Sequence, residues 1–479
     1  MTRPSPATPR AAHTATGDDL VRLLPPPPPP RLDSGTVTAD PGILAAHRAD
    51  HATFTPAGEP AALVRARTTA DVSATLRLAT ELGVPVVPQG TRTGLTGGAN
   101  AVDGCILLSL EKMDRILGID PVEQIGTVQP GVVNAVFSRE AAGAGLFYPP
   151  DPASWESSTL GGNIATNAGG FCCVKYGVTR DYVRGLEVVR ADGAVMRTGR
   201  RTAKGVAGYD LTGLFVGSEG TLGVITEATL ALRPATAEPL TAVAFFATAV
   251  EACRLIVELM AGEPRLSMVE LMDAPSIEAV RAFRDPGFPP GIGAALLVQS
   301  DSAEAAADLS AFAALCGRHG AEVITAGDRE ESRMLLEARR MVGPAVESLG
   351  TILPDDVCVP RRALPDLLAA VGAIADRTGL TITCAGHAGD GNMHPTIIFD
   401  AGDPGQTALA QQAFDDIMRL GLDLGGTVTG EHGVGLLKRG WLRTELDPVA
   451  AATHDAVKRA LDPLGILNPG KVIATPEGD

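Results

Sequence analysis

The apolar positions in the first half of the chain follow both helical and strand periodicities. In residues 69–83 they recur at helical spacing, at Val72, Leu76, Ala79 and Leu82. This spacing predicts a helix that has Thr69 as its N-cap and ends at Gly83. Short apolar runs predict strands at 84–88, 105–110 and 221–232. Residues 185–199 predict a hairpin that turns at Asp192-Gly193. We therefore expect an α+β first half with many glycine turns.

The second half alternates strand-like and helix-like segments, which predicts a second α/β layer with its own core. Strands are expected at 240–247, 267–272, 294–300, 321–325, 380–384 and 396–399. Helices are expected at 249–261, 303–318, 328–346, 362–378, 406–424 and 448–461. The first of these helices follows a capping-box pattern, in which Thr248 is the N-cap and Glu251 is the third helical residue.

The first 34 residues differ in composition from the rest. They are rich in Pro, Thr and Ala and include an unbroken run from Pro25 to Pro30. A segment with so little apolar surface does not form a packed core, and proline runs favour the polyproline conformation. We expect a disordered tail over residues 1–34. A docking site for a proline-binding domain is the less favoured alternative.

Charge and length narrow the classes of function. The chain has 479 residues, with 40 Lys and Arg against 56 Asp and Glu, and a formal net charge of −16. The length allows about two to four domains. Nucleic-acid binding is not expected, because neutralising phosphates requires clustered Lys and Arg. An anionic substrate would have to be held by a locally positive site.

The cysteine pattern and the hydropathy predict the cellular compartment of the protein. The seven cysteines are scattered and form no C-x2-C pair, so a zinc ribbon or an iron–sulfur cluster is not expected. Scattered cysteines in odd number are typical of a reducing compartment. The sequence shows neither a secretory signal pattern nor an apolar run of about 18 residues. We expect a cytoplasmic protein without a transmembrane segment; peripheral association with the inner face of the membrane is the alternative.

A glycine-rich loop follows the predicted strand at 84–88. It extends from Pro88 to Ala99 and contains Gly90, Gly94, Gly97 and Gly98. Closely spaced glycines allow several backbone N–H groups to point into one concavity, which binds an anion without a lysine. The spacing fits neither the G-x-G-x-x-G motif nor a Walker loop. At this point a phosphate-binding loop of another kind and an ordinary glycine-rich loop are equal alternatives.

A second stretch, from Pro149 to Val183, is rich in small residues and hydroxyls. It includes Ser157 to Thr159, Gly161 to Asn163 and Asn167 to Gly170. Small side chains allow the backbone to pass close to a large flat cofactor. Long irregular loops inside a compact domain are uncommon and are usually functional. We therefore expect this stretch to bind a cofactor.

These two loops, together with Pro130-Gly131-Val132 and GLFVGSEGTLGVIT (213–226), resemble the FAD-binding domain of the vanillyl-alcohol oxidase and p-cresol methylhydroxylase (PCMH) type. Within that type the chain is most similar to the GlcD-like branch, which includes the GlcD protein of glycolate oxidase, D-lactate dehydrogenase and D-2-hydroxyglutarate dehydrogenase. The resemblance implies an α+β fold with a two-subdomain PCMH-type FAD-binding domain at 35–237, rejoined by 430–479. It also implies an α/β cap domain at 238–429 with a large, mostly antiparallel sheet.

The resemblance implies which residues bind the FAD. Around the pyrophosphate it places Pro88, Gly90, Thr91, Arg92, Thr93, Gly94, Gly97 and Gly98. Along the flavin and its ribityl chain it places Pro150, Ser157, Thr159, Gly162, Asn163, Gly170 and Gly177. Near the adenine or the ring edge it places Gly223 and Ile225, and Asn468 of the closing motif is a further contact. The chain has no His between His51 and His319, so we expect non-covalent FAD.

Two glycine-flanked motifs in the second half contain three of the eight histidines. GHAGDGNMHP (386–395) holds His387 and His394, and GGTVTGEHGVG (425–435) holds Glu431 and His432. Two strand ends folded about the turn in the first motif would bring both imidazoles to one point. Two His and one carboxylate suit a divalent metal such as Zn²⁺, Mn²⁺ or Fe²⁺. In an extended chain Glu431 and His432 would face opposite ways. Buried core histidines without a metal are the alternative.

The GlcD-like resemblance gives these residues roles. It implies that His387, His394 and Glu431 bind the metal, that His432 is the base, and that Arg339 grips the substrate carboxylate. A guanidinium fork suits a planar anion; a solvated helix face is the alternative for Arg339. In 2-hydroxyglutarate enzymes a lysine precedes a D-V-x-x-P stretch, whereas Pro354 precedes DDVCVP here. The missing cation favours a monocarboxylate such as D-lactate or glycolate.

The implied reaction is the oxidation of a D-2-hydroxy acid to a 2-oxo acid. The metal would lower the pKa of the hydroxyl, His432 would take its proton, and hydride would pass from Cα to flavin N5. An external acceptor, either a quinone, a cytochrome or electron-transfer flavoprotein, would reoxidise the flavin, and the chain could form a homodimer. The alternatives are a D-2-hydroxyglutarate dehydrogenase, a non-redox enzyme similar to alkyl-glycerone-phosphate synthase, and a non-catalytic flavin-binding subunit.

Overall fold

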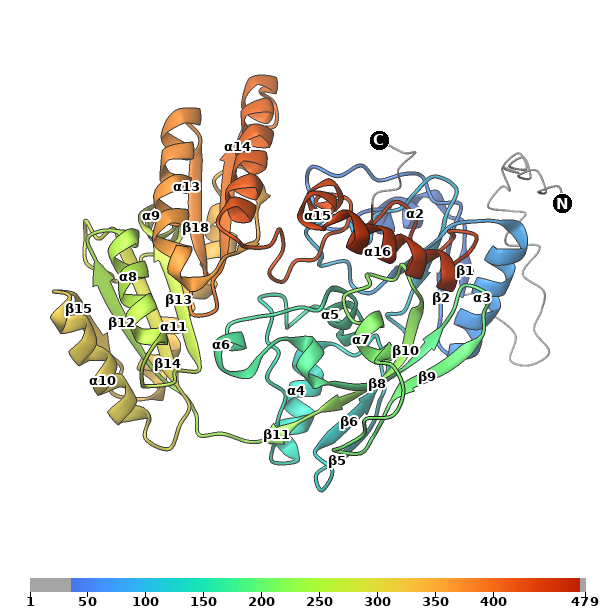
Figure 1. Ribbon diagram of the computed structural model, residues 1–479, viewed down its shortest axis with the longest axis horizontal. Coiled ribbons are helices and arrows are strands. Elements are labelled where there is room, and N and C mark those ends of the chain that lie inside the picture. Colours follow the sequence, from blue (N-terminus) through green and yellow to red (C-terminus); the bar gives the residue numbers. More distant parts are fainter. Residues whose placement is uncertain (1–35, 474–479) are drawn as a thin grey trace.

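The structure is a computed structural model that describes residues 36–473. The tail predicted at 1–34 lies outside the described residues. Figure 1 shows two parts side by side. We call residues 36–237 together with 430–473 the base, and residues 238–429 the cap. Within the described residues, no helix is both long and apolar enough to cross a membrane.

A mostly parallel sheet forms the first layer of the base. Its strands follow the order β1 (Val37–Thr38), β2 (Ala62–Arg65), β4 (Ile106–Ser109) and β3 (Val86–Gln89). Strands β2 and β3 both pair with β4 in parallel. Helix α3 (Thr69–Leu82) packs against this sheet through its predicted apolar face, which is buried at Val72, Leu76 and Ala79.

The N-cap of α3 is Thr68, one residue before the predicted position. The Thr68 hydroxyl accepts a hydrogen bond from the backbone N–H of Asp71, and the Asp71 carboxylate accepts one from the N–H of Thr68. Because Asp71 takes the third helical position, this capping box selects Thr68 over Thr69. Gly83 ends the helix in the left-handed conformation, as predicted.

An antiparallel sheet forms the second layer of the base. Its strands follow the order β5 (Ile116–Asp120), β6 (Ile125–Val128), β10 (Val224–Ala231), β8 (Val183–Val189) and β9 (Val195–Gly199). Strands β8 and β9 form the predicted hairpin. The short strands β7 (Leu146–Phe147) and β11 (Arg233–Pro234) pair beside this sheet.

Short helices connect the layers of the base. They are α2 (Pro41–His47), α4 (Asn134–Gly143), α5 (Leu160–Thr166), α6 (Cys173–Tyr176), the 3₁₀ turn η1 (Thr179–Tyr182) and α7 (Leu211–Phe215). After the cap, the chain returns through α15 (Arg439–Glu445) and α16 (Pro448–Leu461), which lie beside the blue N-terminal segments in Figure 1. Leu467 is fully buried and pairs with Val86 of β3, so the C-terminal segment shares the core of the base.

The cap is built on one large antiparallel sheet. Its strands follow the order β15 (Glu322–Thr325), β12 (Leu240–Phe246), β14 (Ala294–Ser300), β13 (Met268–Asp273), β18 (Thr381–His387), β19 (Asn392–Phe399) and β16 (Thr351–Pro354). Strand β17 (Val357–Cys358) pairs with the end of β19. Two predicted strands, 380–384 and 396–399, are longer than expected, because the glycine-rich residues between them also pair as a hairpin.

Helices cover both faces of the cap sheet. One face packs against α8 (Ala249–Met260), α10 (Ala305–Arg318), α13 (Leu364–Thr378) and α14 (Pro404–Asp423), with the turn η2 (Arg361–Ala363) before α13. The other face packs against α9 (Ala274–Phe283), α11 (Arg329–Arg340) and α12 (Val342–Glu347). Phe171 of the base joins this second core.

Two differences from the predicted cap have a local cause. The helix predicted at 328–346 is two helices, which meet at Met341. Pro344 lacks an N–H and its ring conflicts with the carbonyl of Arg340, four residues earlier, so one continuous helix is excluded. Helix α9, which the apolar pattern missed, begins after Asp273, whose carboxylate accepts a hydrogen bond from the N–H of Ser276.

Candidate active site between the base and the cap

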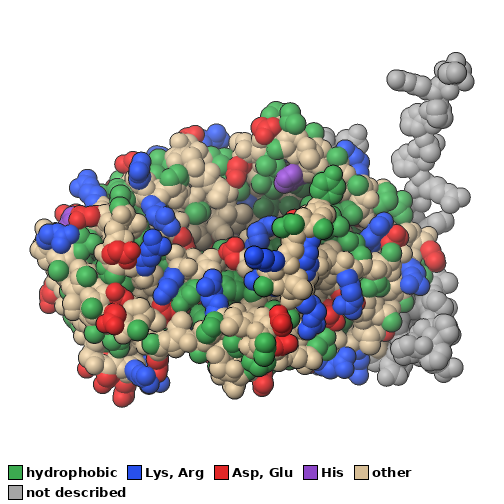
Figure 2. Space-filling view, turned by 60° about the horizontal axis from the view of Figure 1, so that its bottom comes forward, with side chains coloured by type: hydrophobic (Ala, Val, Ile, Leu, Met, Phe, Trp, Pro, Cys, Tyr) green, Lys and Arg blue, Asp and Glu red, His purple; other side chains and the backbone are tan. Residues whose placement is uncertain are grey.

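One large cavity lies where the base loops meet the segment 430–435. It encloses about 1370 Å³ of atom-free space including its open mouth. Figure 2 shows the surface hollowed near its centre. Twelve of the predicted FAD residues line this cavity: Pro88, Gly90, Thr91, Arg92, Thr93, Gly94, Gly98, Thr159, Gly162, Asn163, Gly223 and Ile225.

The first glycine loop presents unused backbone donors to this cavity. Among the described residues, no group accepts a hydrogen bond from any backbone N–H between Gly90 and Gly98. A Cβ on Gly90 would lie 2.3 Å from Thr159 Oγ1, so this position has room for glycine alone. Nearby, the buried Nδ2 of Asn163 also has no partner. Such a concavity of free donors fits the phosphates of a dinucleotide.

Arg92 lines the cavity, and its guanidinium is paired with a carboxylate of the protein. Its Nη1 forms an ion pair with Glu111 Oε1 at 2.9 Å, in the wall of the cavity. Its backbone has a φ of 61°, which is uncommon for a residue other than glycine. The guanidinium charge is therefore balanced within the protein.

Six predicted FAD residues lie outside the cavity lining. They are Gly97, Pro150, Ser157, Gly170, Gly177 and Asn468. Several of them support the wall from behind: Asn468 Nδ2 donates to the carbonyls of Gly98 (2.9 Å) and Glu219 (2.7 Å), and the Ser157 carbonyl accepts from Thr91 Oγ1 (2.8 Å). Gly170 and Gly177 instead allow close approach to Asp151 and Asp181.

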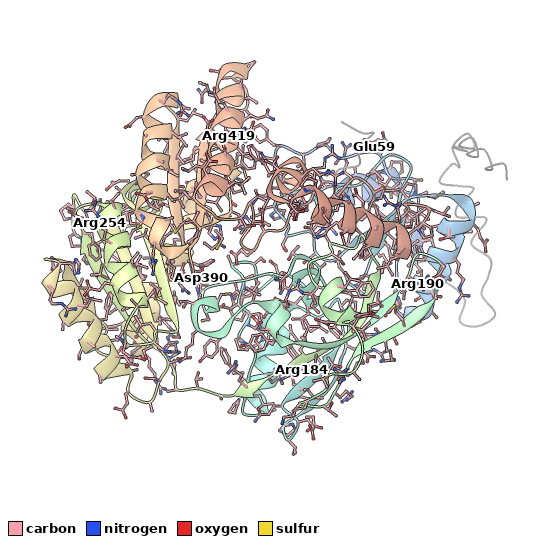
Figure 3. The ribbon with its side chains drawn as sticks, viewed as in Figure 1. Glu59, Arg184, Arg190, Arg254, Asp390 and Arg419 are labelled. Carbon is pink, nitrogen blue, oxygen red and sulfur yellow. The ribbon has the colours of Figure 1, made fainter. Side chains whose placement is uncertain are left out.

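The β18–β19 hairpin brings the two predicted ligand histidines together. Their ring centroids are 5.1 Å apart. His387 Nε2 lies 3.1 Å from Glu431 Oε1, and His394 Nε2 lies 3.3 Å from the same oxygen. The second oxygen of Glu431 is buried without a partner. Figure 3 labels Asp390, in the turn of this hairpin, at the end that points toward α6 of the base.

His432 lies beside this cluster and not away from it. Its ring stacks on that of His394 at 4.8 Å, and both Glu431 and His432 line the cavity. The expectation of opposite faces is wrong because the segment is not extended. The backbone N–H groups of Gly430, Glu431 and His432 all donate to Asp356 Oδ2, at 3.0, 3.1 and 2.9 Å, so the chain curls around this oxygen.

Burial and charge set the protonation states of the cluster. Burial lowers the pKa of His432 to about 4, although Asp356 acts in the opposite direction. Burial alone would also lower the pKa of His387, but the carboxylates of Glu270 and Glu431 outweigh it and raise that pKa. At neutral pH His432 is therefore uncharged and able to accept a proton.

Arg339 lies behind the cluster in the cap. Its side chain is 10% exposed, which excludes the solvated helix face. Its Nε donates to Glu270 Oε2 at 2.9 Å, and its guanidinium carbon lies 5.2 Å from the ring centre of Phe171. Neither Nη atom of Arg339 donates to another described residue, so that edge is available to a carboxylate.

Sequence reasoning missed the acidic residues that hold this site. Glu270 interrupts the apolar strand segment 268–272, and a charge within a buried strand was the available signal. Asp356 follows β16 and is fully buried. Glu219, whose φ is 48°, accepts hydrogen bonds from the N–H groups of Val434 (2.7 Å) and Gly435 (2.9 Å). It thereby ties the cavity wall to the segment that carries Glu431 and His432.

The residues present fit both groups that the resemblance implies. The free N–H groups of Gly90 to Gly98 suit a pyrophosphate. The two imidazoles and the carboxylate of His387, His394 and Glu431 offer ligand atoms within 4.8 Å of one another, and this donor set suits Zn²⁺, Mn²⁺ or Fe²⁺.

Comparison with solved structures first defines the class of fold. The chain matches 4-ethylphenol oxidase from Gulosibacter chungangensis with a TM-score of 0.76, at 21% identity, over 93% of this chain and 95% of that one. It matches p-cresol methylhydroxylase with substrate bound at a TM-score of 0.76 and 20% identity, over 94% and 96% of the two chains. The fold is therefore the PCMH type, with an FAD-binding base and an antiparallel cap.

Sequence comparison then identifies the family. The model of the FAD binding domain matches residues 60–199, and that of FAD linked oxidases, C-terminal domain, matches residues 237–472. The chain is 41% identical over 419 residues to glycolate oxidase subunit GlcD of Bacillus subtilis (87% of this chain, 89% of that protein). It is 34% identical over 425 residues to the probable mitochondrial D-lactate dehydrogenase of Danio rerio (86% and 84%). The chain belongs to the FAD-linked oxidase family, and its cofactor is FAD.

Proposed function

We propose that the protein oxidises a 2-hydroxy monocarboxylate, D-lactate or glycolate, to the 2-oxo acid and passes the electrons to an external acceptor. The observation that carries this proposal is that His432 stacks on His394 beside the cluster of His387, His394 and Glu431, and that Glu431 and His432 line the FAD cavity. The names of two relatives, a glycolate oxidase subunit and a D-lactate dehydrogenase, support the same chemistry.

Non-covalent FAD, held by the loop at 90–98 and by Thr159 to Asn163, would supply the two-electron acceptor. His432 would take the proton of the substrate hydroxyl. Its Nδ1 is buried without a partner, which leaves Nε2 as the nitrogen that reaches the cavity. Burial keeps this imidazole neutral at neutral pH, the form in which one ring nitrogen carries a lone pair for a proton.

Arg339 would hold the substrate carboxylate. Its Nε is fixed by Glu270, so its two Nη atoms present a fork of preset orientation. The other buried cation of this region, Lys438, is fully buried and lies 3.5 Å from Asp356 Oδ2, so it is not available to a second carboxylate. This arrangement supports a monocarboxylate over 2-hydroxyglutarate.

The test is an anaerobic titration of the FAD-loaded protein with D-lactate, L-lactate, glycolate and D-2-hydroxyglutarate. We expect D-lactate or glycolate to bleach the absorbance of the oxidised flavin, and L-lactate to leave it unchanged. Reduction by D-2-hydroxyglutarate alone would reject the monocarboxylate preference. No reduction by any 2-hydroxy acid would reject the proposed function and favour a non-redox enzyme or a non-catalytic subunit.

A further inference from the structure

Two buried carboxylates stand behind the ligand histidines, and neither belongs to the predicted cluster. Glu270, in the middle of β13, is fully buried. Its Oε1 lies 2.7 Å from His387 Nδ1, and its Oε2 accepts a hydrogen bond from Arg339 Nε at 2.9 Å. One carboxylate thus joins a ligand histidine to the residue that we expect to hold the substrate.

Asp356 faces the other histidine at a longer distance, and no hydrogen bond joins its Oδ1 to His394 Nδ1. It is fully buried, and its Oδ1 lies 3.5 Å from His394 Nδ1. Its Oδ2 accepts hydrogen bonds from the backbone N–H groups of Gly430, Glu431 and His432. This carboxylate therefore joins the second ligand histidine to the segment that carries both the third ligand and the base.

The position of these carboxylates decides which nitrogen of each imidazole is free. A carboxylate at Nδ1 favours a proton on that atom, because the N–H then donates to a negative oxygen. In the neutral imidazole, the form that binds a metal ion, the lone pair is then left on Nε2. In both histidines Nε2 is the atom that faces Glu431 Oε1, so both rings are prepared to bind a cation with the same atom.

We propose that Glu270 and Asp356 are positioning residues that preset the metal site and, through their second oxygens, fix Arg339 and His432 to it. The part about Arg339 and His432 rests on the proposed function; the part about the histidines does not. The competing explanation is that Glu270 only neutralises the buried charge of Arg339, which lies 2.9 Å away.

The first experiment measures divalent-metal affinity. Apo wild-type protein and the variants Glu270→Gln and Asp356→Asn are titrated with Zn²⁺ against a chelating dye. Loss of such outer carboxylates typically weakens metal binding by about 10- to 100-fold, and we expect a loss in this range in both variants. Wild-type affinity in Glu270→Gln or in Asp356→Asn would overturn the proposal for that residue.

A matched control distinguishes the loss of a carboxylate beside a ligand histidine from a general loss of stability. Asp273 is in the same strand as Glu270 and is also buried, but it caps α9 and contacts none of the three ligands. Asp273→Asn should lower the Tm and leave the Zn²⁺ affinity unchanged. An equal loss of affinity in this control would show that general destabilisation, and not the contact with Nδ1, weakens the site.

The double variant E270Q/R339M tests the competing explanation and covers a failure of the single variant to fold. It removes both buried charges together, so no unpaired charge remains. Zn²⁺ affinity should stay reduced in the double variant, because His387 still lacks its carboxylate. Recovery of wild-type affinity would show that Glu270 only balances Arg339.

The outcome is distinguishable from failure of the proposed function. A wild-type protein that binds no Zn²⁺, Mn²⁺ or Fe²⁺ would overturn this inference and leave the flavin-reduction test open. A wild-type protein that binds Zn²⁺ through a Glu270-dependent site, with a flavin that no 2-hydroxy acid reduces, would support the inference and reject the proposed substrate class.

Discussion

The two walls of the active site are built in opposite ways. The base presents glycines and free backbone N–H groups to the FAD, with small side chains such as that of Thr159 behind them. The segment 430–435 and the cap present half-buried and buried imidazoles and carboxylates. The comparison teaches that cofactor binding depends here on where the backbone runs, whereas the chemistry depends on which side-chain atoms face one another.

The largest effect should come from the wall that carries the imidazoles and carboxylates. His432→Ala should lower turnover by about 10²- to 10⁴-fold, the usual contribution of a general base. FAD content should stay unchanged, because we propose that the base loops, and not His432, hold the cofactor. Steady-state kinetics with D-lactate and the flavin-to-protein absorbance ratio check both parts. Loss of FAD together with activity would contradict the separation of the two walls.

On the glycine-lined wall of the base, a single added methyl group should lower the FAD affinity. A Cβ on Gly90 would lie 2.3 Å from Thr159 Oγ1, so Gly90→Ala must displace either this hydroxyl or the loop. Overpacking of this kind costs about 1–3 kcal/mol of folding stability. Where the displaced groups also lose their contacts to the cofactor, an equal loss of binding free energy corresponds to a roughly 5- to 150-fold loss of FAD affinity. Fluorescence titration of the apoprotein with FAD measures it. Gly143→Ala, where nothing lies within 4 Å, is the control that should bind FAD normally.

The link between the two walls should give a pH dependence. Burial raises the pKa of Glu219 to about 7 from a usual 4.5, although the N–H groups of Val434 and Gly435 oppose this. The folded protein therefore binds the proton more tightly than the unfolded chain. This contribution to stability is full below about pH 4.5 and is lost as the pH rises through about 7. The Tm of Glu219→Gln apoprotein should fall less over this window than that of wild type; parallel curves would reject the assignment.

The mode of FAD attachment gives a qualitative test of the glycine-lined wall of the base. The cavity is lined by His432 but by no histidine of the base loops. Acid precipitation should therefore release the yellow flavin into the supernatant. Colour that stays in the pellet would show a covalent bond and would contradict binding by main-chain contacts alone.

The smallest expected effect is a loss of stability at a position outside both walls. Thr68→Ala removes the capping box of α3 without touching either wall, and loss of such a cap typically costs about 1 kcal/mol. The free energy of unfolding from urea titration should fall by this amount, with kcat and FAD affinity unchanged. A larger change in activity would show that the two walls are sensitive to general stability.

Much of the base and of the cluster could be predicted because local patterns carry them. The glycine loop at 90–98, the β8–β9 hairpin and the two histidine motifs are each contained in a short segment. The division at Met341 was missed because the apolar spacing continues through Pro344. Helix α9 directly follows the buried strand β13, and its start signal, Asp273 with Pro275, was not used because only the apolar spacing was read.

The sequence by itself determined the family, the cofactor and the identity of the three imidazoles and the carboxylate at the site, because these depend on residue types within short motifs. The tertiary structure alone decided that Glu270 lies against His387 and that Asp356 draws the segment at 430–432 into a curl. These partners are separated by tens to more than a hundred residues. Their contact depends on strand register and on the packing of the base against the cap, which no local pattern contains.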